Sequence, residues 1–252
     1  MSLDTRNAGI IGMDRTKMAN RPVFRAETTI PFFSSDDVEF KFFSGFSVSQ
    51  KQKSIASLHE AYLAQHSTTR IIDISSKSPD DLGVQLSAFN LMITHSRGQY
   101  SVESAFQASK CFEHGGPYED LLMATSREAK RDSRLHQSGS LTGFRFYKYT
   151  FPLEPKTYFY DWLYAKALQG RHELLEKIVE YDAMTDIEFN PAKSINCQAR
   201  SVAKVVGLFR KGLLESALES PARFLEIGYR TDSLPKQKDS ASQVEGEQTV
   251  LF

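Results

Sequence analysis

Apolar side chains recur at helical spacing in several separate segments of the chain. From Ser54 to Gln65 the apolar positions fall about three or four residues apart, as on the buried face of a helix. The same pattern predicts helices over Val102–Phe112, Tyr158–Leu168, His172–Tyr181 and Asn196–Leu218. The tetrapeptide Thr125-Ser-Arg-Glu128 matches a capping box, in which a Thr and a Glu three residues later satisfy backbone N–H groups. It predicts the start of one more helix.

Shorter apolar runs between these helices predict strands. The run Arg70–Ile74 is rich in β-branched residues, Phe40–Phe46 is an aromatic strand or turn, and Ile187–Phe189 is a short strand that ends before Pro191. The two ends of the chain, residues 1–20 and 230–252, are polar and lack periodicity, so we expect flexible segments there. The pattern as a whole predicts one helix-rich α+β domain over residues 21–229.

The composition narrows the class of protein. The chain has 252 residues, of which 40% are hydrophobic, and its 31 basic residues balance its 31 acidic residues. This neutrality argues against a protein that coats nucleic acid without sequence preference. No run approaches the ~18 apolar residues of a membrane span. Cys111 and Cys197 are far apart and the histidines are scattered, so we expect a cytoplasmic protein with neither a disulfide framework nor a bound metal or other cofactor.

Three polar residues, Glu103, Gln107 and Lys110, form a narrow stripe on one predicted helix. At about 100° per residue they fall within a sector of roughly 60°, and the other positions of this helix are apolar or small. A helix that faces water normally carries a broader polar face. The stripe is therefore either the wet side of the helix or one wall of a pocket, and the spacing alone does not choose between them. A carboxylate, an amide and an amine together supply an acid, a hydrogen-bonding group and a nucleophile.

A basic stripe follows in the next predicted helix. Arg127, Arg131 and Arg134 share one helical face, and Lys130 lies beside it. Near the start of a helix such a set can hold a diphosphate. Basic stripes more often form a solvated face that pairs with nearby carboxylates, and this reading is favoured when the residues are taken alone.

An acidic segment, residues 185–191, is the third candidate. In a strand, Asp186, Glu188 and Asn190 would point to one side of the segment while the apolar residues between them point to the other. Such a segment is either an edge strand that faces water or the source of a general acid/base pair.

Four segments in the same order resemble the NADAR (YbiA-like) family. Leu86-Ser-Ala-Phe-Asn-Leu91 and Tyr100-Ser-Val-Glu-Ser-Ala-Phe-Gln-Ala-Ser-Lys110 are similar to the LSNFYP and YPTVEHAYQAQK motifs of that family. Ala129-Lys-Arg-Asp-Ser-Arg134 is similar to its AKRLGR motif. The likeness continues through Trp162 to the acidic segment and the helix after it, and it covers residues 82–212. It implies a single YbiA-like domain.

Departures from the family pattern look like the divergent branch associated with DarT toxins. Asp132 stands where AKRLGR has Gly, and residues 191–198 replace a WG-type turn. For this branch the resemblance implies an antitoxin to a DarT-type toxin. It would remove ADP-ribose from the amino group of guanine in DNA, with RNA as the alternative nucleic acid and ADP-ribose as the product. Two alternatives stay open: an N-glycosidase for free ribosyl-amine metabolites such as riboflavin-pathway intermediates, and a non-catalytic module that masks the toxin.

The same hypothesis assigns roles to the polar residues. Lys110 is the candidate amine for a Schiff base, and Glu103 is the candidate general acid/base, assisted by Asp186 or Glu188. Alternatively the carboxylates act alone and Lys110 binds a phosphate. The substrate-binding candidates are Ser87, Asn90, Gln107, Lys130, Arg131, Arg134, Trp162 and Asn190. The amides of Gln107 and Asn190 would contact ribose hydroxyls or the base edge, and the three basic residues would hold the diphosphate. Trp162 would stack on a base or pack in the core.

Overall fold

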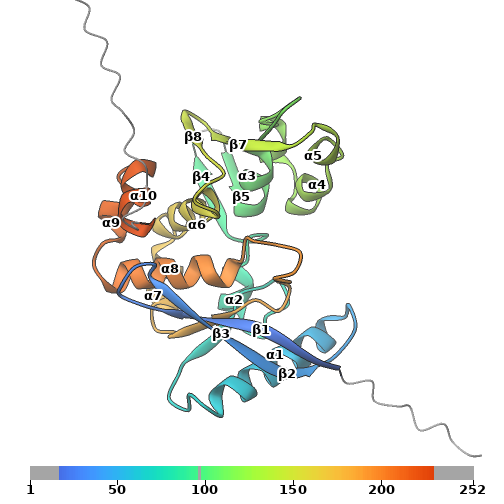
Figure 1. The fold of residues 1–252 in the computed structure, drawn as a ribbon, viewed down its shortest axis with the longest axis vertical. Coiled ribbons are helices and arrows are strands. Elements are labelled where there is room, and N and C mark those ends of the chain that lie inside the picture. The colour runs from blue at the N-terminus through green and yellow to red at the C-terminus, as the bar shows by residue number, and fades with distance from the viewer. Residues whose placement is uncertain (1–16, 96–97, 230–252) are drawn as a thin grey trace, which may run out of the picture.

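The computed structural model describes residues 17–95 and 98–229, in which helices and short strands form a mixed α/β fold (Figure 1). The strands are β1 (Lys17–Ala26), β2 (Phe33–Phe42), β3 (Ile71–Asp73), β4 (Met92–His95), β5 (Gly98–Ser101), β6 (Lys110–Phe112), β7 (Leu141–Phe146), β8 (Tyr149–Phe151) and β9 (Ala183–Thr185). The helices are α1 (Val48–Leu63), α2 (Asp81–Gln85), α3 (Val102–Ala108), the 3-10 helix η1 (Glu119–Met123), α4 (Ser126–Arg131), α5 (Arg134–Gln137), α6 (Tyr158–Gln169), α7 (His172–Ile178), α8 (Gln198–Arg210), α9 (Leu214–Ala217) and α10 (Pro221–Tyr229).

A four-stranded sheet with the order β2-β1-β9-β3 forms one part of the molecule. β1 and β2 pair antiparallel along their whole length, whereas β9 runs antiparallel to β1 and parallel to β3. Because β3 and β9 are parallel, their carboxyl ends meet at one edge of the sheet, and Asp73 pairs in register with Thr185. The loop that follows β9 therefore begins beside the end of β3.

Two helices cover opposite faces of this sheet. Val23 belongs to the apolar cluster of α1, while its neighbour Phe24 belongs to the main core with α8. Successive side chains of a strand point to opposite faces, so α1 and α8 lie on different sides of the sheet. At Gly207 of α8, an added Cβ would lie 2.3 Å from the carbonyl oxygen of Glu27 and 2.4 Å from that of Phe32. Only glycine permits this close approach of α8 to the turn between β1 and β2.

Aromatic packing organises the other part of the molecule, where the sheet β6-β7-β8 lies beside α3 and α6 (Figure 1). α6 is buried over almost its whole length. The Phe159 ring stacks on Phe144 at 4.9 Å and packs against Phe151 at 4.7 Å, and Phe106 of α3 joins the same cluster. These contacts fix the position of α3 relative to β7 and α6.

Several predictions from the sequence are confirmed. The mixed α/β class is correct, and α6 and α7 lie where two helices separated by Gly170 are predicted. The capping box is present at the start of α4: Thr125 Oγ1 accepts a hydrogen bond from the backbone N–H of Glu128, and the Glu128 carboxylate accepts one from the backbone N–H of Thr125.

Three boundaries are wrong, the first two because contacts distant in sequence compete with local helix or strand propensity, and the third because a glycine ends the helix. The helix predicted to end at Phe112 ends at Ala108, because residues 110–112 pair with β7 as strand β6. Residues 187–188 form a turn and residue 189 has no regular structure, whereas the strand of that region is β9, which ends at Thr185. The last long helix ends at Arg210, and Gly212, with φ of +72°, separates it from α9.

The ends of the described chain differ from the expectation in one respect. Strand β1 begins at Lys17, inside the segment 1–20 that is predicted to be flexible. Residues 1–16 and 230–252, the remainder of the two predicted flexible ends, lie outside the described residues. Within the described ranges, no helix combines the length and the apolar character that crossing a bilayer requires.

Candidate active site

A cavity of about 720 Å³ opens between α3, α4 and the loop that joins β9 to α8. It brings together residues from all three polar segments that the sequence singles out. The residues of those segments that line it include the carboxylates Glu103, Asp186 and Glu188, the amides Gln107 and Asn190, and the amine Lys110. The polar stripe is therefore one wall of a pocket, and the acidic segment, residues 185–191, contributes to the lining of the same pocket.

The α3 wall carries a buried carboxylate. Ser101 caps the helix by accepting the backbone N–H of Ser104, which places Glu103 in the first turn. The Glu103 carboxylate is 5% exposed, accepts a hydrogen bond of 2.9 Å from the Gln107 side-chain N–H, and lies 3.6 Å from the Lys130 ammonium. The Oε1 atom of Gln107 is buried and has no hydrogen-bond partner among the described residues. A buried amide oxygen without a partner is costly, and a ligand with a donor group would satisfy it.

Lys110 belongs to the cavity although it lies outside the helix. The chain leaves α3 at Ala108 and enters β6 at Lys110, whose ammonium lies 5.1 Å from the centre of the Phe106 ring. Burial lowers the pKa of the Lys110 ammonium below its ordinary value; Glu103 opposes this shift and Lys130 adds to it. A lowered pKa increases the fraction of neutral amine, which is the nucleophilic form.

Asp186 is a second buried carboxylate, and the turn at residues 187–188 sets its position. Its Oδ1 atom accepts the backbone N–H groups of Glu188 and Phe189 at 3.0 and 3.1 Å, and its Oδ2 atom accepts the Gln198 side-chain N–H at 3.0 Å. Burial raises the pKa of Asp186 to about 6, against the hydrogen bond from Gln198. This pKa allows the carboxyl to exchange a proton near neutral pH.

The other two residues of the acidic segment lie nearer to solvent. Glu188 is exposed and accepts a hydrogen bond of 3.0 Å from the Ser76 hydroxyl, whereas Asn190 accepts the backbone N–H of Ala192 at 3.0 Å. Because the segment turns instead of extending as a strand, the predicted alternation of these side chains with the apolar residues between them is wrong.

Behind the cavity, buried polar side chains connect the acidic loop to the four-stranded sheet. The carboxylate of Asp73, at the end of β3, accepts the Thr185 hydroxyl at 3.0 Å and the backbone N–H of Ile187 at 2.9 Å. His59 Nε2 of α1 lies 2.9 Å from the same hydroxyl. Since that hydroxyl donates to Asp73, we infer that His59 donates to Thr185. Burial lowers the pKa of His59 to about 4, so its ring is neutral at physiological pH.

The basic residues are divided between the cavity and the surface. Lys130 lines the cavity with Arg127, and Lys77 and Lys193 extend the basic lining from other segments. Arg131 and Arg134 do not line it. Arg134 forms ion pairs with Asp120 and Asp132 and stacks on the Tyr118 ring. Part of the predicted basic stripe is thus a solvated face.

Three further predicted site residues also lie outside the cavity lining. The Ser87 hydroxyl donates to the carbonyl oxygen of Val84, and the Asn90 side-chain N–H donates to that carbonyl oxygen and to the Ser87 hydroxyl. Ser87 and Asn90 therefore stabilise the turn after α2. Trp162 is 4% exposed and packs against the Phe151 ring at 5.1 Å. It is a core residue beside a different groove.

Among the cavity residues that are not predicted from the sequence, Gln198 and Tyr160 have the most definite environments. Gln198, besides its bond to Asp186, accepts the backbone N–H of Ala88 at 2.6 Å and the Tyr164 hydroxyl at 3.3 Å. Tyr160 lines the cavity, and burial raises the pKa of its hydroxyl well above the ordinary value, so that the hydroxyl keeps its proton. A single Gln at the start of a helix and a Tyr on an aromatic helix carry no pattern that marks them as site residues.

Comparisons with known proteins place this arrangement in context. A family model described as a DarT1-associated NADAR antitoxin (NADAR-DarT1) matches residues 19–238 of the chain. The matched region includes the four-stranded sheet from residue 19 onward and all the residues that line the cavity. A search among curated proteins found none that matches this chain. Across residues 17–95 and 98–229, no group of three or more His, Cys, Asp or Glu side chains is arranged to hold a metal ion.

Proposed function

The chain belongs to the family of DarT1-associated NADAR antitoxins, and we propose that it acts as an N-glycosidase that removes ADP-ribose from the amino group of guanine in DNA. The observation that carries this proposal is the convergence of two buried carboxylates and an amine of lowered pKa on one cavity. These groups are Glu103, Asp186 and Lys110. Cleavage of a glycosylamine needs a proton donor and is accelerated by a nucleophile at the anomeric carbon, and this set supplies both.

A carboxyl group of the cavity starts the reaction by protonating the ring oxygen of the ribose. The ring then opens as the nitrogen lone pair forms an imine with the anomeric carbon. Asp186, with a pKa of about 6, holds a proton in part of the molecules near neutral pH and suits this step. Glu103 is the alternative donor, because its carboxylate lies within the same cavity beside Gln107.

Lys110 then adds its neutral amine to the imine carbon. The guanine amino group leaves with a proton, and the same carbon becomes a Schiff base with Lys110. Water adds to the Schiff base, the lysine amine is released, and the aldehyde closes to ADP-ribose. One water is consumed, and the products are ADP-ribose and unmodified guanine.

The competing route has no covalent intermediate. In that route the carboxylates stabilise an oxocarbenium-like transition state, and Lys110 binds a phosphate. Borohydride reduction during turnover distinguishes the routes, because it converts a Schiff base at Lys110 into a stable adduct that mass spectrometry locates. Full activity in Lys110→Ala, together with no lysine adduct, would exclude the covalent route.

The basic lining of the cavity supports an ADP-ribosyl group as the substrate handle. Lys77, Arg127, Lys130 and Lys193 come from three separate segments and line one cavity, where a diphosphate would meet several positive charges. The net charge of the whole chain is zero, so we expect weak binding to unmodified DNA, whose affinity depends on the number of phosphates neutralised.

The direct test measures the release of ADP-ribose from an oligonucleotide that carries ADP-ribosylated guanine. We expect release by the wild-type protein and a loss of at least about 100-fold in Asp186→Asn, as for removal of the general acid; the same loss in Glu103→Gln instead would assign that role to Glu103. The matched control is Glu173→Gln, which changes an exposed carboxylate on α7 that does not line the cavity. The same assay with an RNA oligonucleotide that carries ADP-ribosylated guanine tests whether the enzyme prefers DNA or RNA.

The other functions give different results. Release from free ribosyl-amine nucleotides but not from the modified oligonucleotide would assign the cavity to small-molecule metabolism. If the variant that loses hydrolysis still protects cells that express the toxin, the antitoxin acts by masking and the proposal is wrong.

A further inference from the structure

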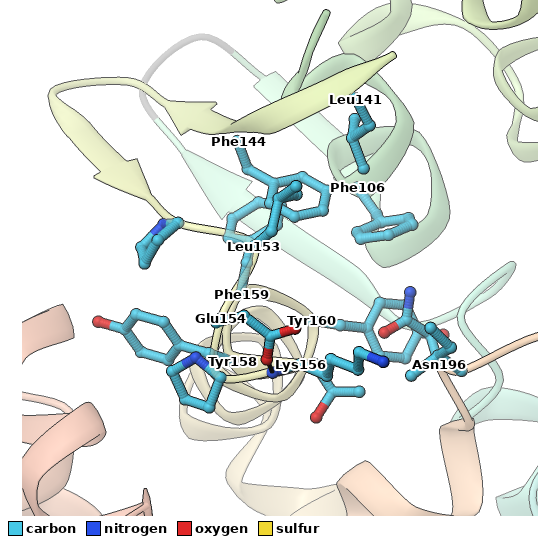
Figure 2. Close-up of a pocket in the computed structure, with 14 residues that line it drawn as sticks. Phe106, Leu141, Phe144, Leu153, Glu154, Lys156, Tyr158, Phe159, Tyr160 and Asn196 are labelled. Atoms are coloured by element: carbon cyan, nitrogen blue, oxygen red, sulfur yellow. Dashed lines mark hydrogen bonds between the residues drawn. The ribbon is translucent and has the colours of Figure 1, made fainter. Parts of the chain in front are cut away.

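A second, smaller cavity adjoins the candidate active site (Figure 2). Its volume is about 270 Å³, and it shares Phe106, Leu141, Phe144, Tyr160 and Asn196 with the lining of the larger cavity. A molecule that fills the larger cavity can therefore extend into the smaller one without leaving the protein surface.

The lining of the smaller cavity is mainly aromatic and aliphatic. Figure 2 shows the rings of Phe106, Phe144 and Tyr160, which come from α3, β7 and α6, around the same space. At its edge, Leu153 is 39% exposed and Ile195 is 56% exposed. These two apolar side chains come from segments about 40 residues apart and converge on one small cavity, where a flat apolar group would cover both.

We propose that this smaller cavity binds the adenine ring of ADP-ribose, an inference that rests on the proposed function of the larger cavity. The substrate contains two purines, and its chemistry decides which of them lies here. The guanine nitrogen is bonded to the reacting carbon, so guanine must lie beside the carboxylates in the larger cavity. Adenine is the free end of the substrate, separated from the reacting carbon by two riboses and a diphosphate.

The lining suits adenine in two respects. Aromatic side chains stack on nucleobases, and such contacts are typically worth about 10-fold or more in affinity per base. The polar groups are few, and among them the Asn196 side chain offers an amide, the group that pairs with the amino group and ring nitrogen of adenine by two hydrogen bonds.

The test compares the affinities for ADP-ribose and for ribose 5-phosphate, which lacks the AMP part, by titration calorimetry. The variant is the double substitution Leu153→Asn with Ile195→Asn, which makes the edge of the cavity polar at two exposed positions and leaves the core intact. The matched control is Phe209→Asn on α8, an apolar side chain that is 42% exposed and lines neither cavity.

We expect the double variant to bind ADP-ribose on the order of 10-fold more weakly than the wild-type protein, with unchanged affinity for ribose 5-phosphate. Phe209→Asn should bind both ligands as the wild-type protein does. An unchanged affinity of the double variant for ADP-ribose, or an equal loss for both ligands, would overturn the inference, and so would a wild-type protein that does not bind ADP-ribose.

These affinities need no catalysis, so the two proposals fail separately. If the expected binding pattern is found but modified guanine is not hydrolysed, the adenine site stands and the proposed reaction is wrong. If hydrolysis occurs and the double variant binds ADP-ribose normally, the reaction stands and the adenine site is wrong.

Discussion

Replacing Asp73 by Asn should change how the stability of this protein depends on pH. The Asp73 carboxylate is 1% exposed and accepts hydrogen bonds from Ser75, Thr185 and Ile187. Burial raises its pKa to about 7, nearby Asp186 adds to the increase, and the three hydrogen bonds only partly oppose it. Asn has nearly the same shape but does not ionise, so the substitution removes this titration.

The sign follows from proton binding in the two states. Between about pH 4 and pH 7 the folded protein keeps a proton on Asp73 that the unfolded chain has already released. The contribution of Asp73 to stability is therefore fully present below the ordinary pKa of aspartate and is lost as the pH rises toward about 7. Each pH unit of this window is worth about 1.4 kcal/mol, so the loss reaches about 4 kcal/mol as an upper bound.

The assay is urea denaturation of the wild-type protein and Asp73→Asn at pH values from about 4 to 8. Emission from Trp162, the single tryptophan and a buried one, reports unfolding. The difference in unfolding free energy, variant minus wild type, should rise with pH by up to about 4 kcal/mol. His59 titrates in the same window with the opposite sign, but it is present in both proteins, and the difference largely removes its contribution.

The control is Asp132→Asn, which should give a flat difference curve between about pH 4 and 8. Hydrogen bonds from Arg134 lower the pKa of Asp132 below the ordinary value, so its stabilising contribution is present throughout this range and is lost only as the pH falls below about 4. A difference curve for Asp73→Asn that stays flat within about 1 kcal/mol would show that Asp73 ionises as readily in the folded protein as in the unfolded chain, and it would refute the burial argument.

Two further substitutions test the packing around α8. Gly207→Ala should lower the free energy of unfolding by about 1–3 kcal/mol, because the added methyl group meets two backbone carbonyl oxygens. The control Gly170→Ala should change this free energy little, because the nearest atom to its added methyl group lies 3.6 Å away. Equal effects of the two substitutions in urea denaturation would contradict this reasoning. Lys204→Met should lower the free energy of unfolding by about 3 kcal/mol, because the buried Lys204 ammonium lies 3.6 Å from the Asp161 carboxylate and donates to the Gly228 carbonyl oxygen. A decrease below about 1 kcal/mol in the same measurement would contradict this prediction.

The residue types of the candidate site can be identified from the sequence, but their arrangement only in part. The spacing of Glu103, Gln107 and Lys110 on one helix predicts a shared wall, and all three do line the cavity. The helix nevertheless ends before Lys110, because pairing with β7 supplies hydrogen bonds that another helical turn would otherwise provide. The predicted cavity wall is therefore correct, although the helix predicted to carry it extends too far along the chain.

The acidic segment shows the same limit. Its residue types predict acid/base chemistry, and Asp186 has the buried position that such chemistry needs. Its conformation depends on a hydrogen bond from the backbone N–H of Ile187 to the carboxylate of Asp73, which is more than a hundred residues earlier in the chain. Such a contact leaves no trace in the local alternation of polar and apolar residues, so a strand is predicted where a turn is found.

The sequence by itself determined the class of fold, the main helices and the polar residues that are available for chemistry, because helix periodicity and capping depend on neighbours within about four residues. Only the tertiary structure decided which of those residues meet. It placed Glu103 and Asp186 at one cavity, left Arg134 in surface ion pairs and buried Trp162 in the core. It also added Gln198 and Tyr160, because burial and hydrogen-bond partners at the site come from segments as far as 110 residues apart.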